Sequence, residues 1–88
     1  MQNDKAKIQN WKLTGNGASV ALVAESKRVK VMCEPQSEFP FTLILNGIFV
    51  SVLFPGQSKS FASCRGDIVE FRAGASAKPS QQTKGYIQ

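Results

Sequence analysis

The segment FPFTLILNGIFVSVLFPG, residues 39–56, decides the fold because two apolar runs flank an Asn-Gly pair at its middle. Asn-Gly between alternating apolar runs is the strongest short-range hairpin signal, since both residues tolerate the positive φ angles of a tight turn. A membrane-spanning helix needs about 20 consecutive apolar residues, and Pro40 and Asn46-Gly47 interrupt this run. The segment therefore predicts a buried β-hairpin that turns at residues 46 and 47.

A two-residue turn also predicts which side chains share a face of the hairpin. The expected pairs are residues 45 and 48, 44 and 49, 43 and 50, 42 and 51, and 41 and 52. The face expected in the core consists of Phe39, Phe41, Leu43, Leu45, Ile48, Val50, Val52 and Phe54. The opposite face consists of Pro40, Thr42, Ile44, Phe49, Ser51 and Leu53.

The second face is too apolar for an ordinary outer surface, which is normally polar in a hairpin that packs on one side. Ile44, Phe49 and Leu53 stand out on it. Either another strand or the C-terminal tail covers them, or they form a patch that binds a protein partner. We expect Ile44, Phe49 and Leu53 to be the protein-interaction patch.

The rest of the chain also alternates apolar and polar residues with the period of a β-strand. Strands are expected at residues 8–14, 18–25, 28–34, 58–64 and 68–72, with the first two pairing as neighbours and 18–25 also pairing with 28–34. No segment shows a helical period. With the hairpin this makes about seven short strands, which predicts an all-β, small antiparallel β-sandwich or barrel.

The two ends read as extended arms around one domain, because they are polar and short of apolar residues. The expected division is an N-terminal arm at 1–7, the β-sandwich domain at 8–73 and a C-terminal extended tail at 74–88. Arms of this kind can gain order by wrapping over neighbouring subunits. The residues expected to make such arm contacts are Lys5, Lys7, Lys78, Lys84, Tyr86 and Ile87.

The composition argues against an enzyme and against a metal site or other cofactor. The chain has no His and two Cys, whereas a structural zinc site needs about four such ligands. No phosphate-binding loop or nucleophile elbow is present, and Glu34 and Glu38 read as a solvated loop rather than a paired-carboxylate site. Cys33 and Cys64 are expected to be free thiols that face the core, since no secretory signal precedes them.

A net charge of +5 favours an anionic neighbour. One alternative is therefore a small basic β-barrel that binds nucleic acid, although the phenylalanines of the hairpin do not lie beside lysines as a base-stacking platform requires. A weaker alternative is an adhesion module that displays Arg65-Gly66-Asp67. Gly and Asp are common turn residues, so we interpret this tripeptide as a turn.

The stretch FTLILNGIFVSVLFPGQSKSFASCRGDIVEF, residues 41–71, resembles the small β-sandwich proteins of bacteriophage virions, such as decoration or cement proteins. The resemblance is one of strand and turn pattern over residues 18–73, and no family residue is carried over. It implies a non-enzymatic virion structural protein, made in the host cytoplasm without a signal peptide, that docks on a capsid or tail surface. The partners expected are other virion proteins and copies of this chain, with no membrane and no small-molecule substrate.

Overall fold

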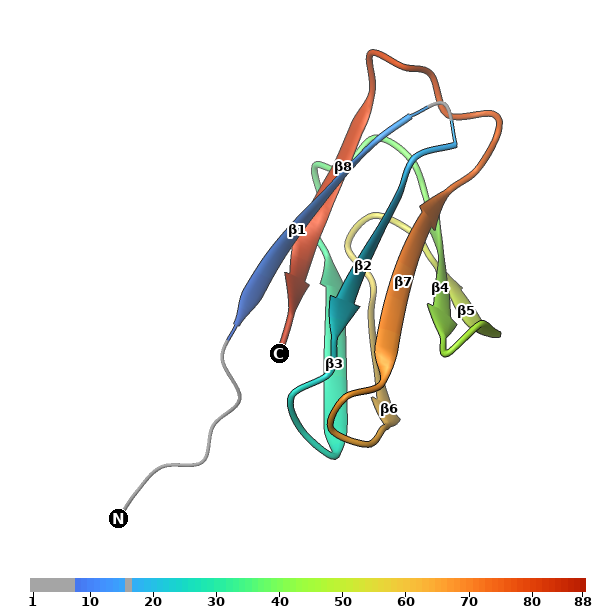
Figure 1. Cartoon of the computed structure of the whole chain (residues 1–88). Helices are drawn as coiled ribbons and strands as arrows, with labels where there is room; N and C mark the ends of the chain where they lie inside the picture. The colour runs from blue at the N-terminus through green and yellow to red at the C-terminus, as the bar shows by residue number, and fades with distance from the viewer. Residues whose placement is uncertain (1–7, 16) are drawn as a thin grey trace.

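The computed structural model describes residues 8–15 and 17–88, and it shows two four-stranded antiparallel sheets packed face to face (Figure 1). This confirms the all-β prediction and decides for a sandwich rather than a barrel. The strands are β1 (Gln9–Thr14), β2 (Ser19–Val23), β3 (Arg28–Cys33), β4 (Phe41–Leu45), β5 (Ile48–Leu53), β6 (Ser58–Ala62), β7 (Ile68–Ala73) and β8 (Gln82–Ile87).

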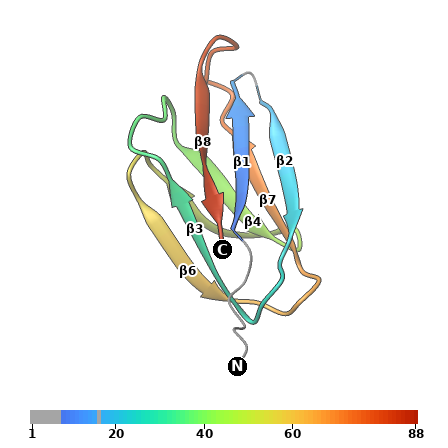
Figure 2. The same ribbon diagram turned by 90° about the vertical axis from the view of Figure 1, so that its left-hand side faces the viewer.

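The strand order shows how the chain is wound. One sheet has the order β1-β8-β3-β6, which faces the viewer in Figure 2, and the other has the order β2-β7-β4-β5. The chain folds back on itself at its middle to form one long antiparallel ribbon. Its four strand pairs are β1 with β8, β2 with β7, β3 with β6 and β4 with β5. Rolled into two sheets, this ribbon is an eight-stranded jelly roll.

The tip of the antiparallel ribbon is the predicted turn. Asn46 and Gly47 have φ angles of 50° and 82°, as a tight hairpin turn between β4 and β5 requires. Asn46 also fastens the tip to β7, because its backbone N–H donates to the Ile68 carbonyl (2.8 Å) and its Oδ1 accepts from the Ile68 N–H (2.8 Å). The turn therefore closes one hairpin and ties it to the next strand of the sheet.

The predicted register of this hairpin is right near the turn and wrong beyond it. Leu45 pairs with Ile48 and Ile44 with Phe49, but an irregularity between Leu43 and Ile44 then shifts the pairing by one residue. An extra residue in one strand is the mark of a β-bulge. Beyond it the pairs are Leu43 with Ser51, Thr42 with Val52 and Phe41 with Leu53.

The bulge reverses the faces expected for the far half of β5. Leu53, expected outside, is buried at 2% exposure opposite buried Phe41. Val52 and Phe54, expected in the core, are 40% and 53% exposed. Periodicity alone cannot detect a bulge, because it assumes one residue of β5 for each residue of β4.

The expected pairing of the first three strands was also wrong. β1 and β3 lie in one sheet and β2 lies in the other, so neither of the two predicted local hairpins forms. Each of these strands has one buried face, and the short connections carry the chain across the core instead of back along the same sheet. The Ala24 N–H, just after β2, donates to the Asp67 carbonyl (2.8 Å), which holds that connection against the start of β7.

The C-terminal residues form part of the core sheet and not only an extended tail, which corrects the predicted 74–88 arm. Residues 82–87 are β8, which lies between β1 and β3. Its inward side chains, Thr83 and Ile87, are buried, and the Thr83 hydroxyl donates to the Phe39 carbonyl (2.7 Å) and accepts from the Phe39 N–H (3.1 Å). The predicted N-terminal arm, residues 1–7, lies outside the described residues.

An aromatic cluster fills the core between the sheets and depends on the absence of a side chain at Gly85. The Trp11 ring lies 4.7 Å from the Phe41 ring, edge to face, and 4.7 Å from the Phe71 ring, stacked. A Cβ atom at Gly85 would come within 2.9 Å of Trp11 Cζ2 and would overlap the Met32 carbonyl. Only glycine lets β8 lie this close to both the indole and β3.

Replacing Gly85→Ala should lower the free energy of unfolding by at least about 2 kcal/mol, because the added methyl group overpacks the core against backbone. Gly74→Ala is the matched control, since a Cβ there meets no atom within 4 Å, and it should change stability by less than about 1 kcal/mol. Urea denaturation followed by tryptophan fluorescence measures both values. Equal stability of the two variants would contradict the packing of Trp11 against Gly85.

Candidate functional site

The outer face of the β2-β7-β4-β5 sheet is unusually apolar, and the strand register shows which side chains meet on it. Val23 on β2 pairs with Ile68 on β7. In the next row Ile44 on β4 lies between Glu70 of β7 and Phe49 of β5. We call the outward side chains Val23, Ile44, Phe49, Val52 and Ile68 the apolar face.

Four members of the apolar face are open to solvent. The exposed fractions are 63% for Phe49, 48% for Val23, 45% for Ile68 and 40% for Val52. At the free edge of the sheet, which β5 forms, Ile48 and Phe54 add two more exposed apolar side chains. An exposed apolar patch that spans several strands is typical of an interaction surface.

The predicted patch of Ile44, Phe49 and Leu53 is confirmed as an exposed surface only at Phe49. Leu53 belongs to the core, because the β-bulge turns it inward. Ile44 does point outward, but its neighbours on the sheet leave it only 7% exposed. The other exposed members of the apolar face are Val23, Val52 and Ile68. Sequence reasoning missed Val23 and Ile68 because local pairing could not assign β2 and β7 to this sheet.

The apolar face has no net charge from the strands that form it. Its one ion pair joins Arg72 Nη2 to Glu70 Oε2 at 2.7 Å, with the two side chains 55% and 24% exposed. A second bond from Arg72 Nε to the same oxygen (3.1 Å) fixes the pair. Each charge is thus neutralised by the other, so a partner that covers this face does not have to desolvate an unpaired ion.

The residues predicted to make arm contacts are spread over different environments. Lys78 is exposed in the loop between β7 and β8, Lys84 and Tyr86 point outward from β8, and Ile87 is buried in the core at 2% exposure. Ile87 is therefore corrected from an arm contact to a core residue, because β8 is an internal strand. Lys5 and Lys7 lie outside the described residues.

The outer face of the other sheet is basic, a feature that sequence reasoning missed. Three of its strands, β1, β3 and β8, direct cations outward, whereas β6 directs Ser58, Ser60 and Ala62 outward. In the part of the chain that the structure describes, none of the four strands directs a carboxylate outward. We call the outward residues Lys12, Arg28, Lys30, Met32, Lys84 and Tyr86 the basic face. Lys12 and Lys84 lie directly opposite each other on β1 and β8. No local pattern could reveal this pairing, because the two strands are near opposite ends of the chain.

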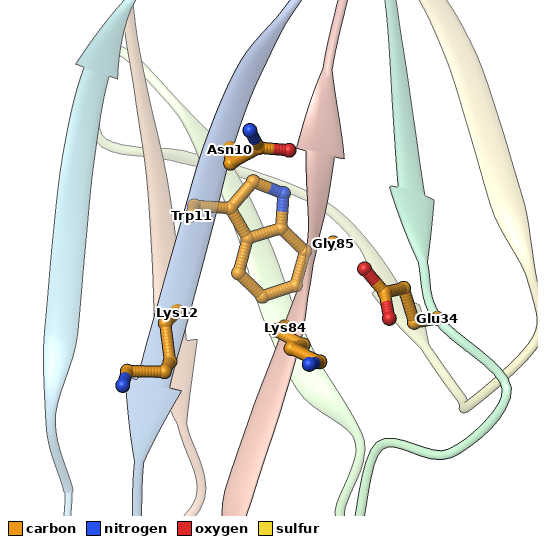
Figure 3. A pocket seen from close by; sticks show the side chains of 6 residues that line it. All are labelled: Asn10, Trp11, Lys12, Glu34, Lys84 and Gly85. Carbon is orange, nitrogen blue, oxygen red and sulfur yellow. The ribbon is translucent and has the colours of Figure 1, made fainter.

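A hollow of 340 Å³ opens on the basic face where β1, β8 and the end of β3 meet (Figure 3). Its lining residues are Asn10, Trp11, Lys12, Glu34, Lys84 and Gly85. Gly85 lines the hollow with its backbone, and the indole of Trp11 reaches across from β1 toward β8. The buried Trp11 Nε1–H has no hydrogen-bond acceptor among the described residues.

The Arg65-Gly66-Asp67 segment forms the turn between β6 and β7, and its charged side chains bond to backbone. Asp67 Oδ2 accepts from the Cys64 N–H at 2.8 Å, and Arg65 Nε donates to the Glu25 carbonyl at 3.4 Å. The bond from the Cys64 N–H, followed by the Asn46 side chain, lowers the pKa of Asp67. The Asp67 side chain therefore closes the turn by accepting from the Cys64 N–H, which agrees with the interpretation of this tripeptide as a turn.

Asp67 should make stability depend on pH in a defined direction. Because its pKa is lower in the folded than in the unfolded chain, its contribution is present above the unfolded pKa of about 4 and is lost as the pH falls through the folded value. Asp67→Asn removes this titration, so the stability difference between wild type and variant should shrink as the pH falls below about 4. Denaturation midpoints between about pH 2 and 7 measure this, and a constant difference would contradict the assignment.

Among the residues that the structure describes, the cysteine and acidic residues outside the two outer faces do not form a metal site. Cys33 is a free thiol in the core, where burial raises its pKa, whereas Cys64 is exposed, which corrects its expected place in the core. Glu38 Oε1 accepts from the Gln82 N–H (2.7 Å) and so ties its loop to β8. Over residues 8–15 and 17–88, no three His, Cys, Asp or Glu side chains gather as a metal site.

No helix formed by the described residues is long and apolar enough to cross a membrane. Comparisons with protein-family models, curated proteins and solved structures find no match to this chain. Its function is therefore inferred from its own surfaces and strand order.

Proposed function

We propose that this chain is a non-enzymatic structural protein of a virus particle, which docks on a capsid or tail protein through the apolar face. The observation that carries the proposal is the exposure of Phe49, Val52, Ile68 and Val23 on the outer face of one sheet. On this proposal the protein is located in the virion, and its partners are other particle proteins and neighbouring copies of itself.

The physical chemistry of the apolar face supports a protein as the occupant. Removing apolar surface from water contributes about 25 cal/mol per Å², and the fully buried centre of an interface is richer in aromatic residues and poorer in charge than ordinary surface. Phe49 is a large aromatic side chain at 63% exposure, and the Glu70–Arg72 pair leaves the face neutral. Such a face suits a largely apolar surface of a protein partner.

The edge position of β5 supports docking as well. β5 has a hydrogen-bonded neighbour on one side only, and Ile48 and Phe54 are exposed along it. An exposed apolar edge strand is an aggregation hazard that proteins normally cover or interrupt. A partner that covers the apolar face and this edge would remove the hazard, which favours a protein that works in a permanent assembly.

The strand order supports a virus particle as the setting. Eight-stranded jelly rolls are an architecture of viral capsid domains and also of lectins and cupins. Fold by itself does not assign function, so the choice among these classes rests on the surface. An apolar, neutral sheet face favours assembly with protein, in agreement with the resemblance of residues 41–71 to phage decoration proteins.

Phe49→Asp should reduce incorporation of the chain into particles at least about tenfold, because it replaces the most exposed aromatic side chain of the proposed interface with a charge. Ser80→Asp, which adds the same charge in the exposed loop between β7 and β8, is the control and should incorporate normally. Quantitative immunoblotting of purified particles measures both. Phe49→Ser is a milder variant that removes the ring without adding charge.

Circular dichroism spectra and melting temperatures of the isolated variants should match wild type, because Phe49 packs outside the core. Normal incorporation of both Phe49 variants would overturn the proposal.

A further inference from the structure

We propose that the basic face, on the sheet opposite the apolar face, binds single-stranded nucleic acid. In this arrangement Lys12, Lys84 and Lys30 contact phosphates and the ring of Tyr86 stacks on a base. The site is separate from the proposed docking face and does not depend on it, because the two outer faces lie on opposite sides of the sandwich.

The first argument is the one-sided distribution of charge. Lys12, Arg28, Lys30 and Lys84 all point outward from this sheet and are exposed, while its strands direct no carboxylate outward among the described residues. None of these four cations forms an ion pair in the part of the chain that the structure describes. A phosphate backbone is the partner that such a face attracts most strongly, since each contact releases condensed counterions.

The second argument is the Lys12–Lys84 pair. These residues are direct cross-strand partners on β1 and β8, and like charges in that position destabilise a sheet. In Figure 3 their ammonium groups point away from each other, as repulsion requires. A phosphate held between the two side chains would convert this repulsion into two attractive contacts, so the pair is consistent with an anionic ligand.

The third argument concerns the aromatic residue in the middle of the cations. Tyr86 lies two residues beyond Lys84 on β8 and pairs with Asn10 on β1 and Met32 on β3. Its side chain is half-buried and outward, so part of one ring face remains available. Stacking of bases on aromatic side chains within a basic surface is how sheet faces bind single strands without sequence preference.

The hollow beside Tyr86 suits a phosphate group. It has a volume of 340 Å³, with Lys12 and Lys84 on its rim and the side-chain amide of Asn10 as a further hydrogen-bonding group. The ring of Trp11 also lines the hollow, but its Nε1–H is buried, so Lys12, Lys84 and Asn10 are the groups that would hold the phosphate. Glu34 on the β3 side is the one carboxylate that lines the hollow, and the two lysines outnumber it.

Fluorescence anisotropy of a labelled oligo-dT or oligo-rU of about 20 nucleotides, titrated with the full chain over a range of salt concentrations, tests the site. Wild type should bind at low salt, with affinity that falls steeply as salt is added. The double variant Lys12→Gln/Lys84→Gln should bind at least about tenfold more weakly and lower the salt slope by about 1.4. Lys59→Gln/Lys78→Gln removes two cations outside the basic face and should retain most of the affinity.

Tyr86 distinguishes nucleic acid from a general polyanion. Tyr86→Ala should weaken binding of the oligonucleotide at least about fivefold, whereas Tyr86→Phe should retain it, because the ring and not the hydroxyl stacks on the base. Binding of inorganic polyphosphate should be the same in both variants. Phe49→Asp should leave the affinity for the oligonucleotide unchanged, so failure of this proposal and failure of the docking proposal are separable.

Absence of binding at low salt would overturn the proposal. So would equal affinity of wild type and Lys12→Gln/Lys84→Gln, or equal loss of polyphosphate and oligonucleotide binding in Tyr86→Ala. Melting temperatures of all variants, measured alongside, should stay close to wild type because none of the substituted side chains is buried.

Discussion

The reversal of the chain at Asn46 and Gly47 is the constraint on which the rest of the structure depends. It is the tip of the antiparallel ribbon in which β4 pairs with β5, β3 with β6, β2 with β7 and β1 with β8. Both residues have positive φ angles, and the Asn46 side chain and backbone bond to Ile68 on the third strand of the sheet. This one local turn therefore also holds the β4–β5 hairpin against β7, which is distant in sequence.

Closure of the ribbon at its other end depends on a fit between Trp11 and Gly85. These residues pair across β1 and β8, and the indole occupies the space that a side chain at Gly85 would fill. The indole also stacks on Phe71 of the opposite sheet. The same contact therefore holds β1 and β8 together and joins the two layers of the sandwich.

The two outer faces of the sandwich differ in chemical character. One sheet presents exposed apolar groups beside a neutral ion pair, and the other presents cations near Tyr86 that form no ion pair with any residue that the structure describes. Burial of apolar surface favours a protein partner on the first, while counterion release favours a polyanion on the second.

The β-bulge in β5 shows why the candidate site was only partly predictable. Phe49 lies before the bulge, where the register set by the turn still holds, and it is exposed on the face that the alternation predicts. Leu53 lies beyond it and points into the core. Alternation specifies a face only while each residue of one strand opposes one residue of its partner.

The sequence by itself determined the strands β1 to β7 and the turn at Asn46 and Gly47, because these follow from local backbone preference and a two-residue period. The tertiary structure decided which strands are neighbours. It made residues 82–87 an internal strand, placed Lys12 opposite Lys84, and brought Val23 and Ile68 beside the hairpin. These pairings join segments far apart in the chain, and they depend on how two apolar layers fit together rather than on the residues within any one strand.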